Sequence, residues 1–192
     1  LLGLGYPGGP QIAQHAEQFT RNNAELTRIN AENISVNPRT NPCKSALGEF
    51  PRPMINSKNY DFSYAGLKTA VLYKVRDLKT AGVKLTDNVV NEICYEFQKA
   101  ALDVLVAKTI KAAREYKVKS LFLSGGVSAN KELRKRLEAE AKKIKIKYSQ
   151  PEMEYTGDNA AMIAVAGYFN YIKNKKMKTA YDAVEMDANL EF

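Results

Sequence analysis

This chain of 192 residues contains no tryptophan, a single histidine and no apolar run close to the length of a membrane span. Crossing a bilayer takes about 20 consecutive apolar residues, so we expect no transmembrane helix and no membrane partner. The basic-then-apolar pattern of a secretory signal peptide is also missing from the first residues. His15 lies in a predicted helix, where we expect a surface position. One histidine excludes a histidine-rich metal site built by this chain alone.

Cysteine is scarce as well, because Cys43 and Cys94 are the only two and their separation is unlike that of metal ligands. Two distant thiols in a chain of this size are typical of a reduced, cytoplasmic protein. The single histidine leaves no Ser–His or Cys–His pairing, and no His-Glu-x-x-His metalloprotease motif is present. The sequence therefore gives no support for a protease.

The residues that are present favour a folded, basic protein. Hydrophobic residues make up 45% of the chain, which is enough for a core. The formal net charge of +8 favours a polyanionic partner such as RNA, although a lysine-rich surface that keeps the protein soluble is a commoner cause. Both interpretations stay open at this point.

The most informative motif is Ser-Gly-Gly-Val-Ser-Ala-Asn at residues 124–130. An apolar strand is predicted before it at 118–123, and a charged helix after it at 131–143. A strand, a glycine turn and a helix suit phosphate binding, because glycine lets the backbone approach an anion and the first helical N–H groups point toward it. The side-chain amide of Asn130 adds one group that both donates and accepts hydrogen bonds. The alternative is a tight turn with no ligand.

The periodicity of apolar residues predicts an α/β arrangement of layers. The helix at 87–116 is the strongest expectation, with Asp87 as its N-cap. The strand at 118–123 is apolar on both faces, as in a central strand covered by helices. The other predicted elements are, in chain order, a turn at 6–10, a helix at 11–19, a polar loop or insertion at 20–48 with a short helix at 24–31, an extended segment at 50–53, a helix at 67–78, a half-exposed strand at 144–148 and a helix at 158–172.

A second candidate site is Thr-Gly-Asp-Asn-Ala-Ala-Met at 156–162. Asp158 precedes a helix of small residues, where a carboxylate commonly caps the first N–H groups. The alternative is a carboxylate that binds a metal at the mouth of a cleft. A single oxygen ligand does not hold a metal tightly, and no second convincing ligand stands near it in the pattern.

Five blocks, taken together and in order, resemble one family. They are residues 2–10 (Leu-Gly-Leu-Gly-Tyr-Pro-Gly-Gly-Pro), 50–54 (Phe-Pro-Arg-Pro-Met), 61–71 (Asp-Phe-Ser-Tyr-Ala-Gly-Leu-Lys-Thr-Ala-Val), 124–130 and 157–164. The chain resembles the C-terminal half of the tRNA N6-adenosine threonylcarbamoyltransferases, called TsaD in bacteria. The resemblance implies the actin-like, Hsp70-like ATPase fold, in which a nucleotide lies between two lobes. It also implies transfer of threonylcarbamoyl from threonylcarbamoyl-AMP to N6 of the adenosine 3′ of the anticodon in tRNA.

The resemblance also assigns roles to residues. Gly9 would contact the adenylate, Gly125 and Gly126 would let the backbone pass close to the nucleotide, and Asn130 would hydrogen-bond it. Asp158 would be one ligand of a divalent iron or zinc ion that acts as a Lewis acid and template. Besides ATP or threonylcarbamoyl-AMP, the implied partners are tRNA and other proteins of threonylcarbamoyladenosine synthesis.

Two features depart from the family pattern: upstream motifs are missing, and the polar stretch from Phe19 to Phe50 is longer than the short link of the bacterial family. The His-x-x-x-His metal ligands and the first phosphate loop, which lie upstream in the family, are not in this sequence. We therefore expect a fragment that lacks the N-terminal lobe and is inactive alone, with the metal shared with that lobe. The expected organisation is the start of the lobe at 1–19, a polar insertion at 20–50, the nucleotide- and metal-contributing lobe at 51–173 and a tail at 174–192.

Two other functions remain open on the sequence alone. One is a non-catalytic scaffold or binding module, because a lobe without its partner exposes apolar surface that favours association. The other is a related actin-like O-carbamoyltransferase. The block at 61–71 and the basic charge argue against the carbamoyltransferase, and a choice between carbamoyl and threonylcarbamoyl adenylate would discriminate the two.

Overall fold

The computed structural model describes residues 2–5, 7–33 and 47–173, and for 26–33 the backbone alone. The described residues divide into two units, with the boundary between Thr156 and Gly157. In order, the elements are α1 (Gly8–Asn33), α2 (Ala65–Thr80), α3 (Asp87–Glu115), β1 (Ser120–Phe122), the 3₁₀ helix η1 (Gly126–Ala129), α4 (Lys131–Lys143), β2 (Lys147–Ser149), the 3₁₀ helix η2 (Met153–Tyr155) and α5 (Ala160–Lys173). The predicted division into domains stays a prediction.

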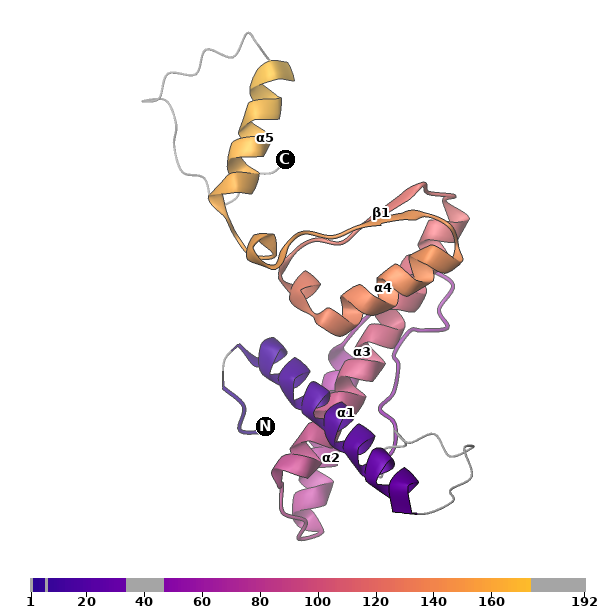
Figure 1. The fold of residues 1–192 in the computed structure, drawn as a ribbon, viewed down its shortest axis with the longest axis vertical. Helices are drawn as coiled ribbons and strands as arrows, with labels where there is room; N and C mark the ends of the chain where they lie inside the picture. The colour runs from indigo at the N-terminus through magenta and orange to yellow at the C-terminus, as the bar shows by residue number, and fades with distance from the viewer. Residues whose placement is uncertain (1, 6, 34–46, 174–192) are drawn as a thin grey trace. The chain divides into compact units, whose positions relative to one another are not determined.

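The long helix α3 is the centre of the first unit (Figure 1). Its apolar stripe packs against α2 and the segment around Phe50 in one cluster, which includes Leu67, Val71, Val75 and Ile93. Helix α1 lies across α3 (Figure 1). The predicted span of α3 is confirmed to within one residue, but Thr86 is the N-cap residue and Asp87 is the first residue of the helix. An acidic residue in the first turn still stabilises the N-terminus through the helix dipole.

The α/β part of this unit is one strand–helix–strand crossover. Strands β1 and β2 are parallel, with Leu121 opposite Tyr148, and α4 connects them. Leu133 and Leu137 of α4 are buried with Leu102 of α3 against the inner side of this sheet. The bounds predicted for α4 are confirmed. Parallel strands need such a crossover, because a tight hairpin joins only antiparallel strands.

The interpretation of β1 as a strand covered on both faces is wrong for the described residues. The sheet there has two strands, and the side chain of Phe122 is 73% exposed. Leu121 and Leu123 face α3 and α4. Phe122 points away from them, and no described element covers it.

The N-terminal part of the chain also differs from expectation. One helix, α1, runs from Gly8 to Asn33, so residues 8–10 of the expected turn and 20–33 of the expected loop are helical. The helices predicted at 11–19 and 24–31 are confirmed as parts of this longer helix. Polar residues such as Asn22 and Asn23 were interpreted as loop, yet the packing of the first part of α1 on α3 overrides their low helix propensity. Tyr6, Cys43 and the rest of the predicted insertion from 34 to 46 lie outside the described residues.

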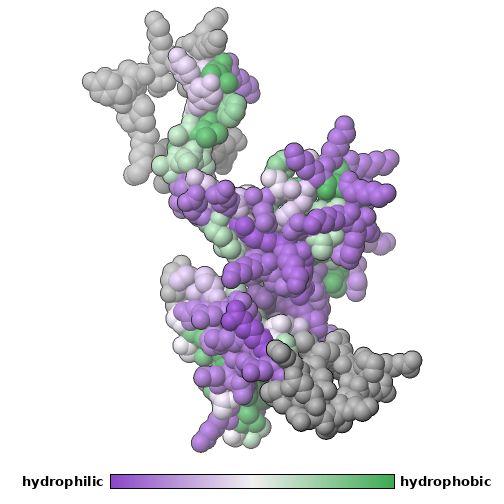
Figure 2. All heavy atoms as spheres, viewed as in Figure 1, coloured by the Kyte–Doolittle hydropathy of each residue, from purple (hydrophilic) through white to green (hydrophobic). Residues whose placement is uncertain are grey.

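The second unit contains α5, whose described residues are all exposed. Its sequence is apolar around most of the helix, as the green side chains of α5 in Figure 2 show. A helix that is apolar all round is typically buried in a larger assembly. None of the described helices is long and apolar enough to span a bilayer.

Candidate nucleotide-binding groove

A groove of about 730 Å³ lies where α1, α3 and the start of α4 meet. Its volume is in the range of cofactor and ligand pockets. Pro10, which follows Gly9 in the first turn of α1, lines one part of it, and Asn130 lines another. The structure therefore brings the last residue of the 2–10 block and the end of the 124–130 motif to the same groove, whereas Gly9, Gly125 and Gly126 are not among the residues that line it.

Asn130 has a structural role in this groove. Its Oδ1 accepts a hydrogen bond of 2.9 Å from the backbone N–H of Leu133, which makes Asn130 the N-cap of α4. Its Nδ2 donates a hydrogen bond of 2.8 Å to Oε1 of Gln98 on α3. The side chain thus fixes the start of α4 relative to α3, and because Nδ2 carries two hydrogens, the bond to Gln98 leaves one for a ligand. Sequence reasoning missed Gln98, which is one residue of a long helix without a motif of its own.

The glycine turn differs from the predicted strand–turn–helix. The turn leads first into η1, and α4 begins only at Lys131, so the N-terminus of α4 does not follow the glycines directly. Gly125 has φ +83° and ψ 171°, a conformation that is essentially restricted to glycine. Neither Gly125 nor Gly126 has an atom within 4 Å of the point where a Cβ would stand. Both positions are therefore open to a ligand approaching the backbone.

Gly9 is the second residue of α1, and a Cβ there would also meet nothing within 4 Å. The expected turn at this position is thus the start of a helix whose first N–H groups have no helical partners. Such an N-terminus attracts anions. The first turn of α1 contains no acidic side chain that would repel one.

The groove is basic. Five basic and two acidic side chains line it, and they are Arg21, Lys99, Lys131, Lys135 and Arg136 against Glu17 and Glu132. Figure 2 shows mostly hydrophilic side chains over this part of the first unit. A hydrogen bond from Lys99 lowers the pKa of Glu49, and the charge of Arg52 lowers it further. Burial alone lowers the pKa of Lys99, but its bond to Glu49 and the charge of Glu96 outweigh burial and raise it, so Lys99 is a cation at neutral pH.

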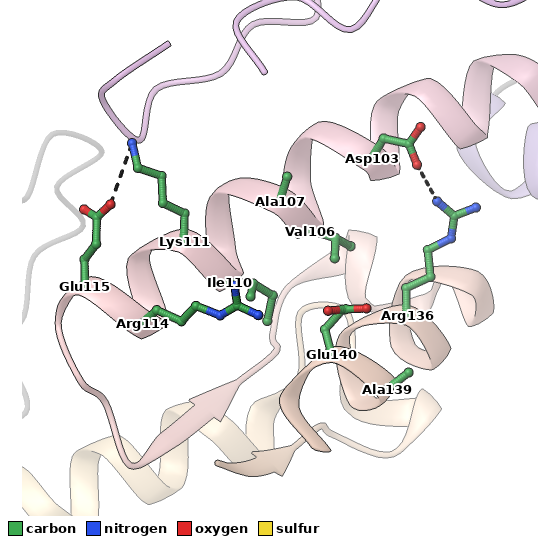
Figure 3. Close-up of a pocket in the computed structure, with 10 residues that line it drawn as sticks. All are labelled: Asp103, Val106, Ala107, Ile110, Lys111, Arg114, Glu115, Arg136, Ala139 and Glu140. Atoms are coloured by element: carbon green, nitrogen blue, oxygen red, sulfur yellow. Dashed lines mark hydrogen bonds and ion pairs between the residues drawn. The ribbon is translucent and has the colours of Figure 1, made fainter. Parts of the chain in front are cut away.

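A second, more open cleft of about 700 Å³ lies between the C-terminal half of α3 and α4 (Figure 3). Its floor is apolar, with Val106, Ala107 and Ile110. Arg136 lines both this cleft and the groove, and Figure 3 shows its ion pair with Asp103.

The environments of His15 and Asp158 differ from those expected from the sequence. His15 is half-buried instead of lying on the surface, and its Nδ1 is 2.5 Å from Oδ1 of the buried Asn91. Asp158 does not cap α5, because Asn159 accepts the hydrogen bond of 2.9 Å from the N–H of Met162. The carboxylate of Asp158 is exposed and makes no hydrogen bond or ion pair with the described residues.

The fold and groove describe an α/β lobe with a basic cleft of ligand size. Comparison with known proteins gives a sharper result, because residues 1–165 match the family model of tRNA N6-adenosine threonylcarbamoyltransferase. Proteins of that name from Thermosipho africanus and Ralstonia pickettii are each 42% identical, over 96% and 87% of this chain and 47% and 41% of their own lengths. A third, from Francisella tularensis, is 40% identical over 100% of this chain and 46% of its own.

This chain belongs to the tRNA N6-adenosine threonylcarbamoyltransferase family, as the five sequence blocks predicted. The family implies an actin-like fold, with which the helices and small parallel sheet are compatible. The chain spans less than half the length of these curated relatives.

Proposed function

We propose that this chain is the C-terminal part of a threonylcarbamoyladenosine-forming transferase, and that its groove receives the adenylate end of threonylcarbamoyl-AMP. The observation that carries the proposal is the convergence of Pro10, at the start of α1, and Asn130, at the start of α4, on one basic groove. Acyl transfer to an amine requires that the leaving adenylate be bound and its charge stabilised. The basic side chains that line the groove suit both requirements.

Within this proposal each residue has a limited role. Gly9 and the Gly125–Gly126 turn allow close approach of the nucleotide to the backbone, and Asn130 hydrogen-bonds it through Nδ2. The basic lining attracts the phosphate, and tRNA is the acceptor whose adenosine amine is acylated. The transfer itself is proposed only for the complete enzyme, so we expect no threonylcarbamoyl transfer by this chain alone.

The residues described here do not by themselves fit the iron or zinc ion of the family. No group of three or more histidine, cysteine, aspartate or glutamate side chains gathers among them in a way that would hold a metal. Asp158 has a carboxylate that is not used for capping, which suits a ligand, but one oxygen does not make a site. No step of the reaction is therefore derived through a metal.

The test is ATP binding to this chain, measured by calorimetry, for the wild type and for Asn130→Asp. Aspartate keeps the oxygen that caps α4 but loses the Nδ2 donor and adds a negative charge in the groove, so we expect weaker ATP binding with the cap intact. Asn130→Ala is less informative, because it also removes the cap. Asn159→Asp makes the same change at the cap of α5 and serves as the matched control.

Two outcomes count against the proposal. Absence of ATP binding by the wild type would make the glycine turn structural, and equal binding by the wild type and Asn130→Asp would remove Asn130 from the site. In either case a binding module is the better account. One observation already favours that alternative, namely the exposed apolar side chains of α5, among them Ile163, Tyr168 and Phe169. Native mass measurement with and without nucleotide would show the association that it requires.

A further inference from the structure

The Phe-Pro-Arg-Pro segment has no role in the function proposed above, yet its arginine lies at the centre of a charged network. Arg52 Nε is 3.0 Å from Oδ2 of Asp103 on α3, and Arg52 Nη1 is 3.1 Å from Oε2 of Glu49. The same Nη1 donates a bond of 2.8 Å to the carbonyl of Phe50. The side chain of Arg52 is only 16% exposed, so the guanidinium is held on several sides.

Both carboxylates that bind Arg52 also bind a second cation. Glu49 Oε1 is 3.1 Å from Nζ of Lys99, and Asp103 Oδ1 is 2.8 Å from Nη1 of Arg136 (Figure 3). Arg136 also forms an ion pair with Glu132, in which its Nε is 2.7 Å from Oε1. Charges of alternating sign thus run without a break from Lys99 to Glu132, and Arg52 is the bridge between the two carboxylates.

The two ends of this network lie in the groove. Lys99, Arg136 and Glu132 line it together with Asn130, whereas Glu49, Arg52 and Asp103 do not. Two cations from different helices are therefore held at the groove by residues outside it. Long basic side chains lose considerable rotamer entropy when a ligand orders them, and a network that orders them in advance reduces that cost.

We propose that Arg52 is a positioning residue, which acts through Glu49 and Asp103 to hold Lys99 and Arg136 where they bind the phosphate groups of a ligand in the groove. This inference rests on the proposed function, because it assumes that a nucleotide binds in the groove. It concerns how the groove recognises the phosphate groups of that nucleotide and makes no claim about its base. The positioning role also explains why Arg52 lies between two prolines, Pro51 and Pro53. Proline fixes the backbone of the segment, so the guanidinium starts from a defined point.

The decisive variant is Asp103→Asn. Simple charge attraction and positioning by the network predict opposite changes in its affinity for ATP. The substitution makes the protein more positive by one charge, so simple attraction predicts tighter ATP binding. Positioning predicts weaker binding, because Arg136 loses its partner on α3. We expect ATP affinity to fall about fivefold, the upper range for a partly exposed ion pair, while adenosine affinity stays unchanged.

Titrations with ATP and with adenosine, in a chelator to exclude metal, give the ratio of the two affinities for each variant. Arg52→Lys keeps the charge but not the planar fork that reaches both carboxylates, so we expect the same loss in smaller degree. Asp77→Asn and Arg76→Lys are matched controls, since Arg76 and Asp77 form an exposed pair at 3.2 Å on α2 away from the groove. Urea unfolding of each variant checks that it is folded.

An Asp103→Asn variant that binds ATP more tightly, or that loses ATP and adenosine affinity equally, would overturn the positioning role. If Asp103→Asn does not fold, Arg52→Lys takes its place. A ratio of ATP to adenosine affinity equal to that of the wild type would then overturn the positioning role. If the wild type binds adenosine and ATP equally well, the proposed function survives and this inference does not. If it binds neither, both are wrong.

Discussion

Removing the charge of Glu96 is expected to stabilise the protein at neutral pH. Glu96 is 1% exposed on α3, and neither carboxylate oxygen accepts a hydrogen bond within the described part of the chain. Its nearest cation is Lys99, whose Nζ is 3.9 Å from Oε2 but only 3.1 Å from Glu49. Burial therefore raises the pKa of Glu96, and the charge of Lys99 offsets this only in part.

The magnitude follows from two opposing terms. At about 4 Å and an effective dielectric constant of about 20, the attraction to Lys99 is about 4 kcal/mol. Burying an ion costs several kcal/mol, and Lys99 is shared with Glu49, so the net cost is about 1–2 kcal/mol. Glutamine keeps the shape but also lacks partners for its amide, which reduces the gain. We expect Glu96→Gln to raise the free energy of unfolding by about 1 kcal/mol, or about 2–4 °C in Tm.

The effect depends on pH in a defined direction. A raised pKa means that the folded state binds the proton more tightly, so stability falls as pH rises above the ordinary glutamate value of 4.5. Urea unfolding at about pH 7.5 and about pH 5 should show the advantage of Glu96→Gln shrinking at the lower pH. Glu138→Gln, on the exposed pair with Lys142, is the control. A variant less stable than the wild type at the higher pH, or a gain independent of pH, would refute the reasoning.

Three further changes test other parts of the structure. Lys108→Met removes a buried ammonium that donates to Ser57 and to the carbonyl of Asn59; we expect a loss of about 3 kcal/mol in urea unfolding. Gly125→Ala should cost about 1–3 kcal/mol because of its positive φ, whereas Gly126→Ala at an ordinary φ should cost less, and equal costs would contradict the backbone assignment. Asn159→Ala should speed hydrogen exchange at the N–H of Met162, whereas Asp158→Ala should not.

The sequence predicted the long elements well because their signals are local. The stripe of α3 and the four-residue spacing in α4 are repeated over several turns, so a single polar residue does not obscure them. The first helix was underestimated for the opposite reason. Its asparagines have low helix propensity, and only contact with α3, which a single sequence does not show, favours helix over loop.

The candidate site was predicted only where a motif marks it. Gly125 and Asn130 stand in a recognisable block, whereas Gln98 and Lys99 are ordinary polar residues of a helix until the fold places them beside Asn130. Likewise, the segment with Arg52 was visible as an extended stretch, but its link to Arg136 spans 84 positions and depends on Asp103 between them. Distant charge networks leave no periodic trace in a sequence.

The two asparagine caps show how structural and functional demands combine in this chain. At the start of α4, Asn130 is both the cap and the proposed nucleotide ligand, so its loss disturbs the helix and the site together. At the start of α5 the roles are divided, because Asn159 caps the helix and Asp158 keeps a carboxylate with no partner among the described residues. A loss of activity in an Asp158 variant of a complete enzyme would therefore report on chemistry alone. The same loss at Asn130 excludes an uncapped helix as its cause only when aspartate, which keeps the capping oxygen, replaces it.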